Sequence, residues 1–236
     1  QLNRAGHLVT VFERDEYIGG LLSLGIPDFK LDKVVVRRRI ETMAQEGVTF
    51  RTGVNVGANY PVEELLAEFD AVCLTCGSTQ PRDLPVPGRE LQGVHFAMEY
   101  LTQQNRRIAG KTFNSQDIIT AKGKRVVILG GGDTGADCLG TAHRHGAKAV
   151  YQFEIMPEPP KERGPDNSWP QWPLILRTTA AHEEGGIRDY NITTKRFSGQ
   201  NGKVERLHAI RVEWVTPDGT SRPVMQEIPG SELVIE

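Results

Sequence analysis

The sequence predicts an α/β protein built from two three-layer units, the first incomplete and the second extended by an antiparallel β-meander. Two patterns lead to this prediction. In the first 153 of the 236 residues, short apolar runs alternate with amphipathic helical segments, which is typical of parallel strands joined by helices. After about residue 189, apolar and polar residues alternate between glycine turns, which is typical of antiparallel strands. The predicted domains are residues 1–112 and 113–236.

The composition is that of an ordinary globular protein, with 38% hydrophobic and 25% charged residues. A net charge of −2 gives no electrostatic reason to expect nucleic acid or a membrane surface as a partner. Three cysteines do not suggest a disulfide framework, so a cytoplasmic location is expected. The chain starts at Gln1, close to an apolar run, and stops at Glu236 inside another, which predicts a piece of a longer protein.

The first half predicts three strands and three helices. The helix from Leu31 to Met43 has apolar residues at helical spacing and is closed by Gly47. The other predicted elements are strands at 7–12, 48–52 and 70–76, a helix from Pro61 to about Phe69, and a helix at about 96–108.

The second half predicts one strand–helix–strand unit followed by the meander. Its elements are a strand at 125–129, a glycine turn at 130–135, a helix at 133–145 and a strand at 147–153. A proline-rich segment at 156–173 holds two tryptophans and is of the irregular kind that is usually functional or interdomain. The meander is predicted to comprise strands at 189–197, 204–215 and 224–228, with turns at 199–202 and 217–219.

The strongest functional signal is the glycine motif G-x-G-x-x-G between the predicted strand and helix. It comprises Gly130, Gly131, Gly132, Asp133, Thr134 and Gly135. The first glycine permits a tight turn, the second lets the backbone approach a pyrophosphate, and the third allows close packing of helix on strand. The helix N-terminus offers free N–H groups to the phosphates. The motif therefore predicts a Rossmann-like dinucleotide site, the alternative being a glycine-rich turn that binds nothing.

Glu154 follows the second strand of this unit, about 20 residues after the glycines, where an adenosine ribose is usually bound. A carboxylate there accepts hydrogen bonds from ribose hydroxyls and repels a 2′-phosphate, which favours NADH over NADPH. Two alternatives stay open. Glu154 is a solvated strand-end residue, or Lys161 and Arg163 meet a 2′-phosphate instead.

Glu13 occupies the equivalent position after the first strand, although no glycine turn precedes it. Gly20 belongs to a group of glycines that would let backbone pass close to a flat ring system, or would simply form a pair of turns. Cys73 and Cys76 form a C-x-x-C pair, but no second pair completes a metal site, so they are predicted to be small buried hydrophobes. No catalytic acid or base and no metal ligand is predicted.

With these motifs in place, the chain resembles the small (beta) subunit of NAD(P)H-dependent glutamate synthase, within the FAD- and NAD(P)-binding flavoproteins of the pyridine nucleotide-disulphide oxidoreductase kind. The resemblance covers essentially the whole length. It is carried by Val11–Arg14, Ile18–Leu22, Gly25–Leu31, Leu74–Arg82, Lys124–Cys138 and Pro165–Pro173.

The resemblance implies an NAD(P)-binding domain inserted into an FAD-binding domain, and transfer of a hydride from NAD(P)H to FAD. Electrons then pass through iron–sulfur clusters to a large subunit, which makes glutamate from 2-oxoglutarate and glutamine-derived ammonia. By the same resemblance, Glu13 binds the FAD ribose, and the glycine turn with Glu154 holds the nicotinamide nucleotide. Further FAD-binding residues implied are Leu21, Lys30, Val56, Gly77 and Arg82.

The chain departs from this family pattern in three respects, one of which is the lack of the C-terminal return to the FAD domain. The cluster-binding cysteines and the first FAD glycine motif lie outside it, so the iron–sulfur clusters are expected only in other segments or in the partner. The segment alone is expected to bind FAD poorly and to make no glutamate. Alternatives are the NAD(P)H-binding part of another flavin and iron–sulfur oxidoreductase, such as a dihydropyrimidine dehydrogenase-like enzyme, or a non-catalytic scaffold with a vestigial nucleotide site.

Overall fold

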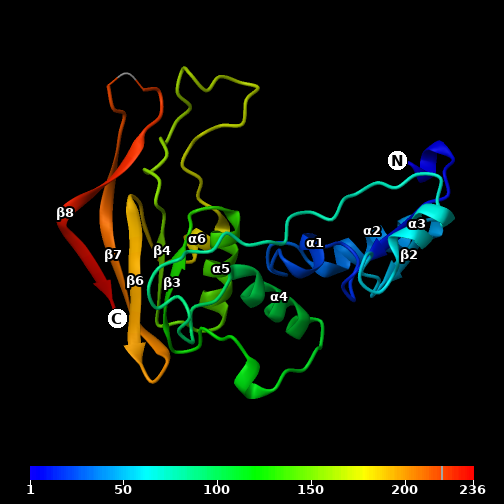
Figure 1. Cartoon of the computed structure of the whole chain (residues 1–236), viewed down its shortest axis with the longest axis horizontal. Coiled ribbons are helices and arrows are strands. Elements are labelled where there is room, and N and C mark those ends of the chain that lie inside the picture. The colour runs from blue at the N-terminus through cyan, green and yellow to red at the C-terminus, as the bar shows by residue number, and fades with distance from the viewer. Residues whose placement is uncertain (219) are drawn as a thin grey trace. The chain divides into compact units, whose positions relative to one another are not determined.

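The computed structural model describes residues 1–218 and 220–236, which form two compact units (Figure 1). The first unit comprises residues 1–81 and 101–114, and the second comprises residues 82–100 and 115–236. Both are α/β units with parallel strands, as the sequence predicts. The domain division between residues 112 and 113 stays a prediction.

The first unit contains a two-stranded parallel sheet, in which β1 (Thr10–Glu13) pairs with β2 (Thr49–Thr52). Asp32 caps the main helix because its side chain accepts a hydrogen bond from the Val34 N–H. Gly47 lies just past that helix with φ 106°, a conformation that glycine adopts without strain. The helices are η1 (Asn3–Ala5), α1 (Leu21–Leu24), α2 (Lys33–Gln45), α3 (Val62–Glu68) and most of α4 (Ala97–Ile108).

The predicted buried strand at 70–76 is wrong. Residues 71–80 are irregular and exposed, and both Cys73 and Cys76 are exposed rather than buried. A strand needs a hydrogen-bonded neighbour, and an apolar run needs cover on both faces of its sheet. The β1–β2 sheet supplies neither, because β2 is the only described strand that pairs with β1 and no third strand joins them.

An ion-pair cluster ties α4 to the segment that follows β1. Arg106 contacts Asp15 at 2.9 Å and Glu16 at 2.8 Å, and Lys111 contacts Glu16 at 3.1 Å. Burial opposes ionisation of Glu16, but hydrogen bonds from Arg106 and Lys111 prevail and lower its pKa from 4.5 to about 2. The carboxylate is therefore stabilised in the folded first unit.

This pKa gives a pH dependence with a defined sign. The folded pKa lies below the unfolded one, so the stabilisation is present above pH 4.5 and is lost as the pH falls from 4.5 towards 2. Glu16 is 39% exposed, so solvent screening limits the effect to about 1 kcal/mol or less. The protection factors of the amides in residues 10–16 and 101–111, which correct measured exchange for its intrinsic pH dependence, should fall over this pH range. In Glu16→Gln this fall should be smaller, and an identical pH profile of the protection factors in the variant would contradict the assignment.

The second unit contains a parallel sheet in the order β3–β4–β5, with β3 at Arg125–Leu129, β4 at Ala149–Phe153 and β5 at Ile187–Asp189. Helix α5 (Asp133–Arg144) connects β3 to β4, so the predicted strand–turn–helix–strand order is confirmed. The remaining helices are η2 (Ser115–Asp117) and α6 (Ala180–Glu183), which packs beside α5.

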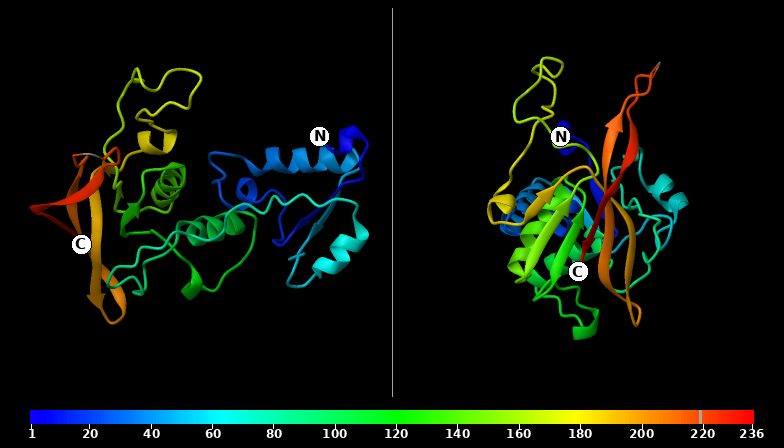
Figure 2. Two further views of the ribbon diagram at one scale, coloured as in Figure 1. Left: turned by 45° about the horizontal axis from the view of Figure 1, so that its top comes forward. Right: turned by 90° about the vertical axis from the view of Figure 1, so that its left-hand side faces the viewer.

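The meander is confirmed as a separate antiparallel sheet of β6 (Ile192–Gln200), β7 (Lys203–Val215) and β8 (Val224–Ile235). Figure 2 shows it beside the parallel sheet of the same unit. The predicted third strand ended at 228, whereas β8 continues to Ile235. Of the predicted turn at 217–219, Gly219 lies outside the described residues.

A shared hydrophobic core joins the two sheets of the second unit. Phe153 of β4 packs with Phe197 and Leu207 of the meander, all of them buried. Helices α5 and α6 lie on the other side of the parallel sheet (Figure 1). The unit therefore has three layers, and the turn between β3 and α5 lies at its edge. In the described part of the chain, no helix is long and apolar enough to cross a membrane.

Candidate functional site

The glycine turn lies at the carboxyl end of β3, beside the carboxyl end of β4. Gly130 has φ 120°, and its N–H donates to the Phe153 carbonyl at 2.8 Å, which fixes the turn to the neighbouring strand. Ligands of doubly wound sheets bind at this edge, outside the carboxyl ends of the strands.

The second and third glycines of the motif have opposite surroundings. A Cβ on Gly135 would lie 2.3 Å from the Gly130 carbonyl oxygen and 2.5 Å from Nε2 of Gln152, so the helix and the turn are in direct contact there. A Cβ on Gly132 would meet no described atom within 4 Å. The fold thus fills the space at Gly135 and leaves it open at Gly132. Close approach of a pyrophosphate requires the open position.

The N-terminus of α5 faces this open position. Gly132 is the N-cap and no side chain caps the helix, and the first helical hydrogen bond runs from Ala136 N to Gly132 O at 3.0 Å. The N–H groups of Asp133, Thr134 and Gly135 precede that bond, so they are available to an anion. The exposed carboxylate of Asp133 is stabilised by the positive end of the helix dipole, but its negative charge does not attract a phosphate.

Glu154 lies against the turn, one residue past β4. Its Oε2 accepts a hydrogen bond from Gly131 N at 2.6 Å, and its Oε1 accepts one from Met156 N at 3.1 Å. Each carboxylate oxygen keeps a second lone pair, so both can also accept from ribose hydroxyls. The structure therefore brings Glu154 and the glycine turn together, and this donor and acceptor set fits a nicotinamide dinucleotide.

The residues predicted to bind FAD lie in the first unit, apart from Arg82. Glu13 ends β1, and its Oε1 accepts a hydrogen bond from Asp15 N at 3.0 Å. Gly20 is the N-cap of α1 with φ 51°, and Leu21, the next residue, is 62% exposed. Lys30 precedes α2 and is exposed, and Val56 forms an isolated β-bridge with Tyr60.

Gly77 lies in the irregular segment at 71–80 with φ 65°, and Arg82 is exposed at the start of the second unit. The strand, the G-x-G-x-x-G turn and the twelve-residue helix at 125–144 lie in the second unit. In the first unit, β1 is followed by Gly19, Gly20 and the four-residue helix α1.

Two polar residues of the site were missed from the sequence. Gln152, inside β4, is only 2% exposed and donates from Nε2 to the Gly130 carbonyl at 2.9 Å. His182 of α6 contacts Oε1 of Gln152 at 2.9 Å. A glutamine inside an otherwise apolar buried strand is a usable signal, because a buried amide needs partners. No sequence pattern connects it to a histidine 30 positions later.

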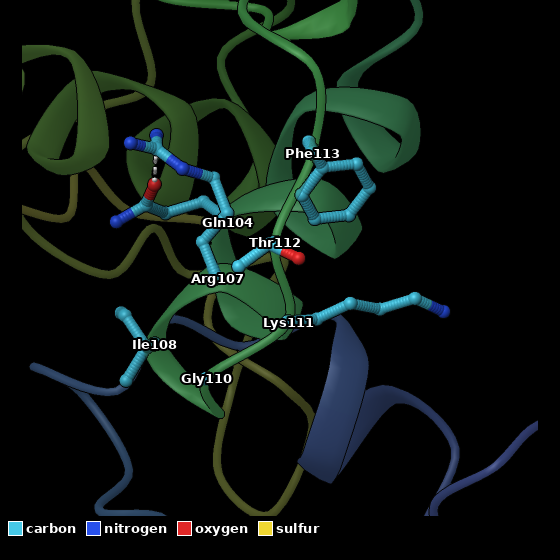
Figure 3. A pocket seen from close by; sticks show the side chains of 7 residues that line it. All are labelled: Gln104, Arg107, Ile108, Gly110, Lys111, Thr112 and Phe113. Atoms are coloured by element: carbon cyan, nitrogen blue, oxygen red, sulfur yellow. Dashed lines mark hydrogen bonds between the residues drawn. The ribbon is translucent and has the colours of Figure 1, made fainter.

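A shallow open cavity of about 420 Å³ lies at the end of α4 in the first unit (Figure 3). The figure shows Arg107 paired with Gln104, at 3.1 Å, while Lys111 points away from them. None of the predicted site residues lines it, and it is too open to enclose a ligand. The residues lining it are Gln104, Arg107, Ile108, Gly110, Lys111, Thr112 and Phe113. In the described part of the chain no group of metal-binding side chains is found.

The parallel sheet, glycine turn and strand-end carboxylate define a dinucleotide-binding oxidoreductase fold. The chain belongs to the pyridine nucleotide-disulphide oxidoreductase family, whose model matches residues 1–207. The predicted pairing of FAD with NAD(P)H agrees with this membership.

The chain is 56% identical to the glutamate synthase [NADPH] small chain of Mycobacterium tuberculosis, covering 100% of this chain and 48% of the relative. It is 47% identical to the glutamate synthase [NADH] of Schizosaccharomyces pombe, covering 98% of this chain and 11% of the relative. The chain thus spans about half the length of the first relative. The predicted resemblance to glutamate synthase is confirmed.

Among solved structures, Mycobacterium tuberculosis FprA in complex with NADPH is similar, with a TM-score of 0.71 and 18% identity. The match covers 96% of this chain and 61% of that one. At this identity the similarity concerns the fold alone, and it confirms the predicted Rossmann-like architecture.

Proposed function

We propose that this chain binds NAD(P)H at the Gly130–Gly135 turn and forms the electron-input part of a glutamate synthase. The observation that supports this proposal most directly is the open space over Gly132. The α5 N-terminus, the tightly packed Gly135 and the Glu154 carboxylate belong to the same turn. The high identity to small chains of glutamate synthase supports the same proposal.

In this proposal the nicotinamide and the flavin supply the hydride chemistry when bound, and the protein binds and orients them. The helix N–H groups hold the pyrophosphate, Glu154 holds the adenosine ribose, and Glu13 belongs to an FAD site that segments outside this chain complete. The electrons serve glutamate synthesis from 2-oxoglutarate and glutamine through a large subunit, with the iron–sulfur clusters outside this chain. The cytoplasmic location and the lack of nucleic-acid or membrane partners stay predictions.

The test is calorimetric titration of the purified chain with NADH and NADPH in parallel. We expect saturable binding of one nucleotide per chain, with a Kd between about 1 μM and 1 mM, the usual range for metabolic cofactors and substrates. If neither titration releases binding heat, the result would favour a scaffold with a vestigial nucleotide site. For the flavin step, the complete protein mixed with NADH or NADPH should lose its oxidised-flavin absorbance.

Replacing Glu154 should change the nucleotide preference. In Glu154→Gln the negative charge beside the ribose is lost, so the affinity for NADPH relative to NADH should rise about 5- to 10-fold, the effect of one partly screened charge. The measurement is the ratio of the two dissociation constants. Glu158→Gln removes the same charge four residues along, in the exposed proline-rich segment, and should leave the ratio unchanged. An unchanged ratio of the two dissociation constants in Glu154→Gln would show that Glu154 does not contact the adenosine ribose.

A further inference from the structure

One peptide of the glycine turn is held from both ends by β4. The carbonyl of Gly130 and the N–H of Gly131 belong to the same planar peptide and point in opposite directions. Gln152 donates to that carbonyl at 2.9 Å, and Glu154 accepts from that N–H at 2.6 Å. Gln152 lies in β4 and Glu154 one residue past its end, so both side chains reach the turn from the carboxyl end of this strand. Together they prevent this peptide from rotating.

The amide of Gln152 is itself oriented by a histidine. Nδ1 of His182 lies 3.1 Å from the Thr179 backbone nitrogen, which can only donate, so Nδ1 is an acceptor. In the neutral ring the proton is then on Nε2, which donates to Oε1 of Gln152 at 2.9 Å. The NH₂ group of Gln152 is therefore the end that faces the Gly130 carbonyl. The network has one direction, from Thr179 through His182 and Gln152 to Gly130.

The start of this network is fixed to α5. Thr179 and His182 form a capping box at the N-terminus of α6. Ala181 is fully buried, and Arg144 of α5 forms a two-point ion pair with Glu184, at 2.6 and 2.9 Å. The network thus runs from the helix that follows the glycine turn back to the turn itself.

We propose that Gln152 and His182 are positioning residues for the nucleotide site. They act through the Gly130–Gly131 peptide, which they hold in the orientation that leaves the space over Gly132 open and Glu154 in place. This proposal rests on the proposed function, because it deepens the same site. When the turn is already ordered before the nucleotide binds, less conformational entropy is lost on binding. Loss of the network should therefore lower the affinity.

The first test is a double-mutant cycle on NADH affinity. Gln152→Leu should weaken binding about 10-fold, which corresponds to loss of one buried hydrogen bond at the turn. His182→Phe should weaken it about 3-fold, since it frees the Gln152 amide to rotate and removes the capping bond to Thr179 but leaves Gln152 in place. The double variant Gln152→Leu with Glu154→Leu should lose less affinity than the two single losses multiplied together, because removing either hydrogen bond alone already releases the peptide. Additive effects or an unchanged affinity in Gln152→Leu would overturn the proposal.

The second test needs no nucleotide. Hydrogen exchange at the Gly131 amide should be slow in the unmodified chain, about 10-fold faster in Gln152→Leu, which loses one hydrogen bond to the peptide, and about 3-fold faster in His182→Phe, which only weakens that bond. If the unmodified chain binds neither nucleotide but Gly131 exchange accelerates as stated, the proposed function fails and the positioning role holds. Unchanged exchange in both variants would overturn the positioning role. His182→Phe replaces a half-buried ring by a ring, so it keeps the test available if Gln152→Leu does not fold.

Discussion

Replacing Gly132 with valine should weaken binding of both NADH and NADPH at least about 100-fold while the protein stays folded. A Cβ on Gly132 meets no described atom within 4 Å, so the fold leaves room for the new side chain, which fills the position proposed for the pyrophosphate. Loss of two charge-assisted hydrogen bonds, at about 1.5–3 kcal/mol each, accounts for an effect of this size. The measurement is calorimetric titration with each nucleotide.

The fold should tolerate the valine because Gly132 has φ −79° and ψ −176°, which is ordinary extended backbone. An N-cap valine costs about 1 kcal/mol, which thermal unfolding can verify. Gly132→Ala is the graded control, since its smaller side chain should weaken binding less than valine does. Wild-type affinity in the valine variant, with a normal unfolding midpoint, would place the pyrophosphate away from this turn.

The fold was predictable where local signals determine it. The glycine motif, the apolar run before it and the helical spacing after it identified β3, the turn and the beginning of α5, because each of these features is encoded by adjacent residues. Gly47 likewise marked the end of α2. Turn glycines between alternating segments identified the meander and its antiparallel pairing.

The failures concern features that depend on distant partners. The run at 70–76 has the composition of a buried strand, but burial requires a neighbouring strand, which no local pattern can supply. The predicted burial of Cys73 and Cys76 was wrong for the same reason. In the candidate site, the motif and Glu154 were found by their spacing. The contacts of Gln152 with Gly130 and His182 depend on how β4 and α6 pack, so the sequence did not indicate them.

Replacing Gly135 with alanine should destabilise the second unit by about 1–3 kcal/mol. Alanine is the better helix former by about 1 kcal/mol, so this substitution would stabilise the protein at a helical position with free space around it. Here the added Cβ would lie 2.3 Å from the Gly130 carbonyl oxygen, which is backbone that cannot move freely, and 2.5 Å from Nε2 of Gln152. Overpacking of a tight contact costs about 1–3 kcal/mol, and the displaced Gln152–Gly130 hydrogen bond adds about 1 kcal/mol.

Urea unfolding followed by tryptophan fluorescence measures this loss, because Trp169, Trp172 and Trp214 all belong to the second unit. Gly132→Ala is the matched control, since it adds the same methyl group three residues earlier with no atom within 4 Å. Its expected cost is limited to the poorer N-cap, about 1 kcal/mol or less. Gly135→Ala and Gly132→Ala thus separate the two requirements on the motif, close packing at the third glycine and open space at the second. Equal stabilities of the two variants would contradict the packing role of Gly135.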